Sequence, residues 1–459
     1  MKKIIVITGI GLLVISLSRC HKAELSPEST YDDRLSGGKA TVFDESSHAF
    51  THNIEGLNAR DLRVHELGDQ AFEVKFVAPP APVFGGLGSI FNNVSCINCH
   101  RNDGGGFPSA GSATSGLLMR ISQAGTDAHG GALAVDGYGT QLQDQALLGY
   151  QPEANVLINY TESPFTYPDG RETSLRIPSY TLANPYLPIS VPYMLSPRLA
   201  PPVVGMGLLE NIPENTIESF VDAGDQNGDG IIGKVNRVYN GYTGETDLGR
   251  FGLKANTSSL LVQVATAYQQ DMGITSFVHP DENSFGQLQW PSSTQTGKKE
   301  LADSTLNATT FYIRTLAVPA RRNVNDPDVQ AGSILFNQIN CSGCHRPTIM
   351  TGPDFQVPQL SGQRIHPYTD LLVHDMGEGL SDNRPDFLAT GREWRTQPLW
   401  GLGLLQRTTG TAFYLHDGRA RTIEEAILWH EGEAAKSKKA FTELTQGQRI
   451  QLMKFLNSL

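Results

Sequence analysis

The residues best suited to chemistry in this chain form two copies of one pattern, C-x-x-C-H. The copies consist of Cys96, Cys99 and His100 and of Cys341, Cys344 and His345. In this pattern the thiols can form thioethers with heme vinyl groups while the histidine reaches the iron from the same side. A disulfide needs no histidine, and zinc usually has its second pair of ligands nearer in sequence. The patterns therefore predict two covalently bound c-type hemes, with thiol–disulfide exchange as the alternative.

The first twenty residues indicate export. Lys2 and Lys3 precede an apolar run over residues 4–18, which is typical of a secretory signal and too short to span a bilayer comfortably. Residues 1–20 are therefore predicted to be a signal peptide that either leaves Cys20 as a lipidated N-terminus or is removed by simple cleavage nearby. Residues 21–40 are polar and are predicted to be a tether. The expected location is the periplasm or the cell envelope.

The charge balance excludes some partners. A net charge of −11 does not favour nucleic acid or an anionic membrane surface. Membrane association is expected only through a lipid at Cys20. The 47 glycines and 26 prolines indicate extensive loops, which suits small heme domains because the cofactor supplies much of the core.

Two helices are expected to frame the second motif. Asp326 followed by Pro327 is typical of a helix N-terminus, so we expect a helix that runs into Cys341. Near the C-terminus, Thr445 and Gln448 form a capping-box pattern before an amphipathic helix. The apolar face of that helix consists of Leu452, Phe455, Leu456 and Leu459. This arrangement is what a small cytochrome c domain requires.

The remaining sequence patterns indicate the domain boundaries and the fold class. Residues 41–317 are predicted to be an N-terminal heme domain with a large insertion, and residues 318–459 a C-terminal cytochrome c domain. From the first motif to about residue 195 the sequence shows no sustained helical period and predicts loops and short strands. A helical pattern returns at 259–270. The predicted fold class is mainly α, with two cytochrome c-like heme domains, extensive loops and short β insertions.

A weak internal repeat supports two related halves. The segment "RLAPPVVGMGLL" at 198–209 matches "WRTQPLWGLGLL" at 394–405 in one proline, two glycines and a pair of leucines. Two related heme halves would explain both the repeat and the paired motifs. Chance similarity in a glycine-rich chain is the alternative.

The stretch "DQNGDGIIGKVN" at 225–236 has the pattern of the first half of an EF-hand calcium loop. The ligand oxygens and the sharp turn would come from Asp225, Asn227, Asp229, Gly230 and Ile231. Asn236 stands where such loops have a bidentate glutamate, so one charge and one ligand are missing. Because the same residue types make ordinary turns, a structural calcium site and a plain turn both fit the sequence.

Two segments of the C-terminal half carry a resemblance to a known family. The segments "TQPLWGLGLL" at 396–405 and "YLHDGRARTIEEAILWHEGEA" at 414–434, with the two heme motifs, resemble the diheme oxidoreductase family of peroxidases. That family is related to bacterial diheme cytochrome c peroxidases and to the methylamine-utilisation diheme protein. The resemblance implies two cytochrome c-like domains, in which one heme is reactive and the other passes it electrons.

The resemblance also implies the iron ligands. His100 and His345 match the proximal ligands of the family. Counting from "HDGR" places His430 at the position of the second axial ligand of the C-terminal heme, which is then coordinated by two histidines. The alternative is that His430 is a surface residue, and the competing ligands are His366, His374 and Met376.

The segment "SLLVQVATAYQQDMG" at 259–273 is similar to the distal segment of the N-terminal heme in the relatives. The similarity places Gln263 at the distal glutamine, which orients bound oxygen, and Asp271 at the catalytic acid/base glutamate. When the two halves are superposed through Ser259 and Thr422, the counterpart of His430 is Ala267. Alanine cannot bind iron, so this heme is expected to have an open face.

Two departures from the family pattern bear on this expectation. Asp271 replaces a glutamate, which shortens the reach of the carboxylate by one methylene group. Leu253 stands where relatives have a tryptophan between the hemes, which puts an aromatic electron relay in doubt. Glu210 is a reserve candidate for the catalytic carboxylate, with a helix-terminal surface position as the alternative.

The expected function is that of an exported, diheme c-type oxidoreductase of peroxidase type. Peroxide would be reduced at the N-terminal heme, where a carboxylate moves the proton, with electrons passed through the C-terminal heme. The expected electron donor is a small cytochrome, a cupredoxin or a small-molecule reductant. The alternatives are a diheme electron-transfer cytochrome without catalysis, and oxidation of another substrate by high-valent iron.

Overall fold

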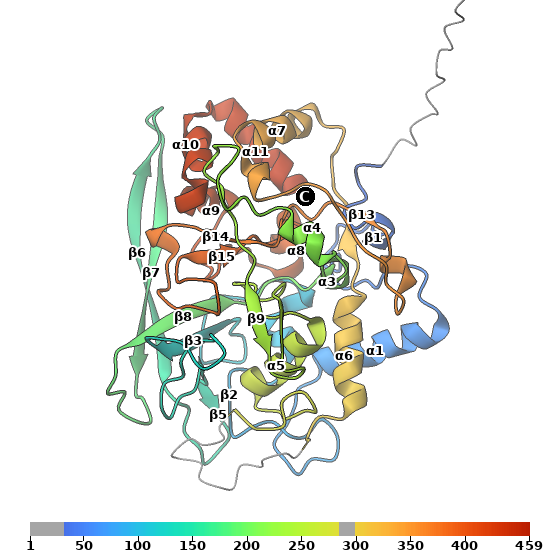
Figure 1. Ribbon diagram of the computed structural model, residues 1–459, viewed down its shortest axis with the longest axis vertical. Coiled ribbons are helices and arrows are strands. Elements are labelled where there is room, and N and C mark those ends of the chain that lie inside the picture. The colour runs from blue at the N-terminus through green and yellow to red at the C-terminus, as the bar shows by residue number, and fades with distance from the viewer. Residues whose placement is uncertain (1–31, 284–298) are drawn as a thin grey trace, which may run out of the picture. The chain divides into compact units, whose positions relative to one another are not determined.

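The computed structural model describes residues 32–283 and 299–459, and the bounds of its helices confirm the helices expected from capping signals (Figure 1). Asp326 caps a helix that begins at Pro327, and Thr445 and Gln448 form the expected capping box, which satisfies otherwise unpaired N–H groups. The α-helices are α1 (Ala59–Glu73), α2 (Cys96–Cys99), α3 (Met206–Glu210), α4 (Glu214–Glu218), α5 (Leu260–Met272), α6 (Asp303–Arg314), α7 (Pro327–Gln338), α8 (Leu405–Thr409), α9 (Ile423–Trp429), α10 (Ala435–Glu443) and α11 (Gln446–Ser458).

The expectation of a mainly α fold was wrong. The described residues are 29% helical and 19% strand, and their strands form many small sheets. The strands are β1 (Thr41–Val42), β2 (Ile90–Phe91), β3 (Leu117–Gln123), β4 (Gln141–Leu142), β5 (Gln145–Ala146), β6 (Asn155–Thr166), β7 (Glu172–Ala183), β8 (Tyr193–Leu199), β9 (Arg237–Asn240), β10 (Glu245–Leu248), β11 (Val318–Pro319), β12 (Ile349–Met350), β13 (Arg364–Ile365), β14 (Val373–Asp375) and β15 (Glu393–Arg395).

The long hairpin of β6 and β7 accounts for much of this correction. Its strands pair antiparallel from Asn155 with Ala183 to Thr166 with Glu172, and exposed and half-buried side chains alternate along them. Because no residue of these strands is fully buried, the apolar signal of a strand is weak there. The hairpin packs on the C-terminal half, where the hydroxyl of Tyr167 donates a hydrogen bond of 2.6 Å to Glu424 (Figure 1).

Two pairs of crossing helices build the scaffold, and they are close copies of each other. Helix α1 crosses α6, and helix α7 crosses α11 (Figure 1). At each crossing a glycine lets the backbones approach. A Cβ atom on Gly68 would lie 2.1 Å from the carbonyl oxygen of Ala308, and one on Gly332 would lie 2.1 Å from that of Gln451. Close packing at these points requires the absence of a side chain.

The internal repeat lies at equivalent places in the two pairs. Gly205 and Gly401 both have positive φ, 69° and 66°, directly before a helical turn. Two residues later, a Cβ atom on Gly207 or Gly403 would lie 2.1 Å from a carbonyl oxygen of α6 or α11. The same local structure in both copies supports two related halves.

Residues 34–459 form one compact unit. The division of this unit into two heme domains near residue 318 stays a prediction. Strand β1 pairs in parallel with β11, which joins the start of the described chain to that point. The last residues of the predicted tether, Gly38–Ala40, form a 3-10 turn, and Ala40 is buried. The predicted signal peptide, including Cys20, lies outside the described residues. No helix within the described residues is long and apolar enough to cross a membrane.

Candidate active site

Both C-x-x-C-H motifs line one continuous cavity of about 750 Å³. The first motif and the distal helix α5 border one part of it, and the second motif and helix α9 border another. The predicted site residues that line the cavity are Cys96, Cys99, His100, Gln263, Asp271, Cys341, Cys344, His345 and His430. The fold thus brings together residues that are up to 334 positions apart in the chain (96 to 430).

The first motif presents an imidazole suited to bind a metal. Its cysteines form the single turn α2, and His100 follows as the C-terminal cap. The Nδ1 atom of His100 is 2.7 Å from the carbonyl oxygen of Pro201, and a carbonyl can only accept, so Nδ1 carries the proton. The Nε2 atom is then the unprotonated ligand atom. Burial lowers the pKa of His100, which keeps the ring neutral.

The second motif repeats this arrangement. His345 has Nδ1 2.9 Å from the carbonyl oxygen of Tyr368, and burial lowers its pKa to about 4. Phe336 of α7 contacts the His345 ring at a centroid distance of 6.4 Å, as Phe72 of α1 contacts His100 at 6.1 Å. Each proximal histidine is therefore held by a backbone carbonyl and a phenylalanine from the first helix of its half.

The cysteines are poorly suited to thiol–disulfide exchange. The four motif cysteines are free thiols in the structure. Burial raises the pKa of Cys96 and of Cys341 to about 12, and burial also raises the pKa of Cys99 and Cys344. Exchange requires a thiolate, which redox enzymes obtain by lowering the thiol pKa. The environment of these thiols therefore disfavours thiol–disulfide exchange.

His430 lies across from His345. The helix α9 begins at the cap Thr422 and ends at Trp429, so His430 is the first residue after it. Its Nδ1 atom is 2.7 Å from the carbonyl oxygen of Ala426, which again leaves Nε2 as the ligand atom. The two ring centroids are 6.5 Å apart. Imidazoles that bind opposite sides of one metal ion, each at about 2 Å, have centroids roughly 6 Å apart.

The competing ligands are placed differently. His374 is buried between two carboxylates, with Nε2 2.9 Å from Asp370 and Nδ1 2.7 Å from Glu433. Burial acts to lower the pKa of His374, but Asp370 and Cys344 outweigh it and raise that pKa well above its usual value. Both ring nitrogens are thus occupied. Of the other two candidates, Met376 lines the cavity, and the Nδ1 atom of His366 is 2.9 Å from the hydroxyl of Thr348.

The distal helix α5 places Gln263, Ala267 and Asp271 along the cavity. These residues are four apart, so they lie on one face of the helix. Ser259 caps α5 as Thr422 caps α9, which supports the superposition that equates Ala267 with His430. Within the described residues, His100 has a ring contact with Phe72 and with no second histidine. The two motifs therefore differ on the side opposite the proximal histidine.

Asp271 is held by groups that were not predicted from the sequence. Its Oδ1 atom accepts a hydrogen bond of 2.7 Å from Gln141 of β4, and Arg120 of β3 donates to the neighbouring Gln270. Burial raises the pKa of Asp271, whereas Gln141 and Arg120 act to lower it. These partners come from the β insertion, which the sequence predicted only as loops and short strands, and no motif marks them.

Glu210, the reserve carboxylate, has a structural role. Its Oε1 atom accepts a hydrogen bond of 2.8 Å from the backbone of Leu260, at the first residue of α5. Its Oε2 atom forms an ion pair of 2.8 Å with Arg314. Glu210 does not line the cavity and instead stabilises the N-terminus of the distal helix, where a negative charge is favourable.

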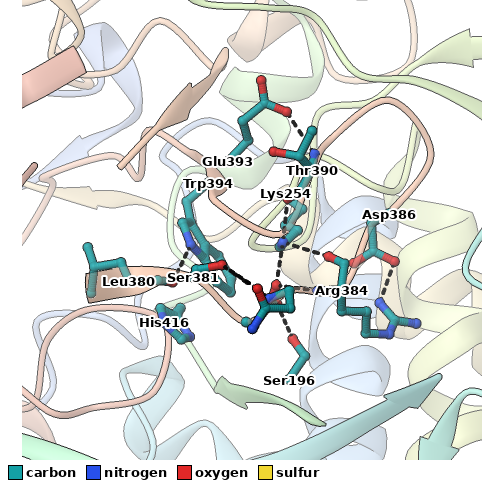
Figure 2. A network of polar contacts seen from close by, with 12 residues as sticks. Ser196, Lys254, Leu380, Ser381, Arg384, Asp386, Thr390, Glu393, Trp394 and His416 are labelled. Carbon is teal, nitrogen blue, oxygen red and sulfur yellow. Dashed lines mark hydrogen bonds and ion pairs between the residues drawn. The ribbon is translucent and has the colours of Figure 1, made fainter. Parts of the chain in front are cut away.

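An aromatic side chain lies beside Leu253, although Leu253 itself is not aromatic. Trp394 of β15 packs against Leu253 and stacks on His416 at a centroid distance of 3.8 Å. Figure 2 shows the polar contacts around it, in which the buried Lys254 donates to the carbonyl oxygens of Arg384 and Thr390. A tryptophan from the C-terminal half therefore lines the shared cavity beside Leu253.

The candidate calcium loop has the contacts of a turn. Asp225 accepts from the backbone of Gly230 at 2.9 Å, and Asp229 accepts from the backbone of Ile231 at 2.8 Å. Asn227 accepts from the backbone of Asp229 at 2.8 Å. The side chain of Asn236, the last predicted ligand, is buried elsewhere and bonds to Lys254, Asp386 and Leu388. Calcium binding stays a prediction.

Both C-x-x-C-H motifs line one cavity, and a backbone carbonyl orients the histidine of each. This arrangement is typical of diheme proteins. The family described as "Di-haem oxidoreductase, putative peroxidase" matches residues 31–459, and the chain belongs to this family. The chain is thus an oxidoreductase of a heme-binding family, which confirms the resemblance.

The chain is similar to a solved structure of hydrazine synthase from Kuenenia stuttgartiensis, with 14% identity, a TM-score of 0.37, and coverage of 90% of this chain and 91% of that one. No curated protein matches the chain.

Proposed function

We propose that the protein is a peroxidase-like oxidoreductase with two covalently bound hemes, and that peroxide reacts at the N-terminal motif. The observation that supports this assignment is the difference between the two motifs. His345 faces a second imidazole, that of His430. Ala267, which matches His430 when the capped segments are superposed, lines the cavity on the distal helix and cannot bind a metal. A heme held by both His345 and His430 would be suited to pass electrons, and a heme held by His100 alone could also bind a substrate.

The residues present fit the two cofactors. The four motif thiols would form the thioethers, and three neutral imidazoles would bind iron through Nε2: His100 at the first site, and His345 with His430 at the second. The hemes supply the redox chemistry when bound. A second imidazole in place of a thioether sulfur lowers the reduction potential of a heme. The second site is therefore suited to give electrons to the first.

The distal residues supply proton transfer and orientation. The carboxylate of Asp271 takes the proton from the near oxygen of the peroxide and returns it to the leaving oxygen. The amide of Gln263, which lines the same cavity, orients the bound peroxide. Gln141 holds the Oδ1 atom of Asp271, so the other carboxylate oxygen is the one that exchanges the proton. Burial makes Asp271 a stronger proton acceptor, because it raises the pKa.

The reaction needs an electron donor and a compartment. We propose that electrons enter at the C-terminal site from a small cytochrome, a cupredoxin or a small-molecule reductant. We also propose export to the periplasm or the cell envelope, with Cys20 as the lipid anchor, because the sequence begins with a secretory pattern.

Stopped-flow absorption after peroxide addition tests the proposal. The wild type should react, and Asp271→Asn should react about 10²–10⁴-fold more slowly, since that is the usual contribution of a positioned acid/base. Glu210→Gln is the matched control, because Glu210 contacts the same helix but does not line the cavity. A wild-type spectrum that does not respond to peroxide would refute the peroxidase function and leave electron transfer without catalysis.

A further inference from the structure

Arg395 presents to the cavity a guanidinium group of which one nitrogen has no hydrogen-bond partner. It ends strand β15, lines the cavity and is only 6% exposed. Its Nε atom donates to the carbonyl oxygen of Gly252 at 2.9 Å, and its Nη2 atom donates to the side chain of Gln397 at 2.7 Å. Its Nη1 atom is buried and has no hydrogen-bond partner. A buried charged donor without a partner is unfavourable, because it has lost its hydrogen bonds to water, and it therefore calls for an explanation.

Two other arginines of this cavity wall, Arg198 and Arg384, have carboxylate partners, whereas Arg120 donates to the side chain of Gln270. Arg198 forms an ion pair of 2.9 Å with Asp386, and Arg384 forms one of 2.6 Å with the same carboxylate. Within the described residues Arg395 forms no ion pair. The carboxylate that acts on the pKa of Arg395 is that of Asp370. This carboxylate is already paired with His374 at 2.9 Å. Burial lowers the pKa of Arg395 to about 10, so it still carries its charge at neutral pH.

The guanidinium group of Arg395 is fixed in one orientation. Gln397 accepts from Nη2 and also donates to the backbone carbonyl of Arg395 at 3.3 Å, while Gly252 holds Nε. An arginine held in this way keeps its remaining donor in a defined direction. Such a group is suited to a carboxylate, because a guanidinium matches the planar geometry of a carboxylate.

Arg395 lines the cavity that both motifs share. Its backbone N–H donates to the carbonyl oxygen of Leu253, another lining residue, at 2.9 Å. Its strand neighbour β14 contains His374, whose Nδ1 atom is 3.5 Å from the sulfur of Cys344. A carboxylate bound by Arg395 therefore belongs to a molecule in this shared cavity.

We propose that the Nη1 atom of Arg395 binds a carboxylate of the molecule that fills the cavity, and that this carboxylate is a heme propionate. The proposal rests on the diheme function proposed above. A fixed positive charge at a propionate favours the reduced heme, because reduction adds an electron. Arg395 thus acts as a positioning residue that raises the reduction potential of the heme whose propionate it binds.

Holoprotein variants with both hemes attached test the proposal. The variants are Arg395→Gln, Arg395→Lys and the matched control Arg322→Gln. Arg322 is also a buried arginine, but it donates to backbone carbonyls at the C-terminus and does not line the cavity. Heme staining on a denaturing gel establishes that both cofactors are attached. Resonance Raman spectra then report the propionate-bending bands, and spectroelectrochemical titration reports the two potentials.

We expect Arg395→Gln to shift one propionate-bending band and to lower the potential of one heme. Arg395→Lys should leave the reduction potential of that heme close to its wild-type value. Arg322→Gln should change neither the Raman band nor the potential. Unchanged propionate bands in Arg395→Gln would overturn the proposal even if the potential moved. Acetate that perturbs the wild-type spectrum but not that of Arg395→Gln would instead identify a site for a free carboxylate, and would overturn the propionate assignment. A wild type without heme stain would refute the diheme function itself.

Discussion

The two motif regions share one scaffold and differ on one side of it. In the first, Phe72 of α1 lies between His100 and Tyr312 of α6, with centroid distances of 6.1 and 5.4 Å. In the second, Phe336 of α7 lies between His345 and Phe455 of α11, with distances of 6.4 and 5.3 Å. These side chains follow the crossing glycines Gly68 and Gly332 by one helical turn, so each half positions its proximal histidine in the same way.

The two motif regions differ on the side opposite the motif histidine. Helix α5 continues past Ala267 to Met272 and carries a carboxylate along the cavity, whereas α9 ends at Trp429 and its next residue is a histidine. Under the function proposed above, one scaffold would serve both substrate binding and electron transfer, and a short segment of the distal helix would determine which. The predictions below alter each side of this comparison in turn.

The largest effect is expected from substitutions at the two distal positions, Ala267 and His430. Ala267→His should fill the open position and abolish carbon monoxide binding by the reduced protein, because imidazole is a good iron ligand. His430→Ala should open a second position and raise the stoichiometry from one carbon monoxide to two. Difference spectra of the reduced protein measure both changes.

The neighbouring Thr266 provides the control for this exchange. Thr266 also lines the cavity, but its place on the helix is turned by about 100° from that of Ala267. Thr266→His should therefore leave one binding position open. A wild type that binds either no carbon monoxide or two molecules would contradict the proposed difference between the sites.

The second prediction concerns the shared scaffold. Gly68→Ala and Gly332→Ala should each lower the free energy of unfolding by about 3 kcal/mol, since the added methyl group would overlap a backbone carbonyl that cannot move away easily. Gly447→Ala, in helix α11, should be neutral or stabilising, because its added methyl group meets no atom within 4 Å and alanine favours helix. Denaturant unfolding of the holoproteins measures these changes. A large loss in only one half would argue against two equivalent crossings.

The parts of this site that the sequence predicted are those set by local patterns. The helix at Pro327 follows from a cap and a proline, and the C-terminal helix follows from its capping box. For these two helices the chemistry of a few neighbouring residues determines the local structure, so spacing carries the information. The place of His430 follows instead from the family resemblance, by counting from "HDGR".

The parts that could not be predicted depend on distant segments. The β6–β7 hairpin carries a turn signal, Pro168-Asp169-Gly170, but its half-exposed strands lack the apolar alternation that would have extended it. The contact of Gln141 with Asp271 joins positions 130 residues apart. No sequence pattern records such a contact, because it arises only when the insertion folds over the distal helix.

The smallest expected effect concerns His65, which has no equivalent in the other half. His65 lies three residues before Gly68, and the corresponding residue of α7, three before Gly332, is Val329; both are buried. Burial lowers the pKa of His65 to about 4, while its Nδ1 atom stays 2.8 Å from the hydroxyl of Thr315.

Because the pKa of His65 is lower in the folded state than in the unfolded state, acid favours unfolding. No stability is lost above the unfolded pKa of 6.5, and the loss grows as the pH falls from there to about 4. At pH 5 it should reach about 2 kcal/mol. His65→Val, which copies the C-terminal half, should remove this loss, whereas valine in place of the exposed His48 should not. Denaturant unfolding at pH 7 and pH 5 provides the measurement. An unchanged difference between the two pH values in His65→Val would show that the acid sensitivity of the N-terminal half arises elsewhere.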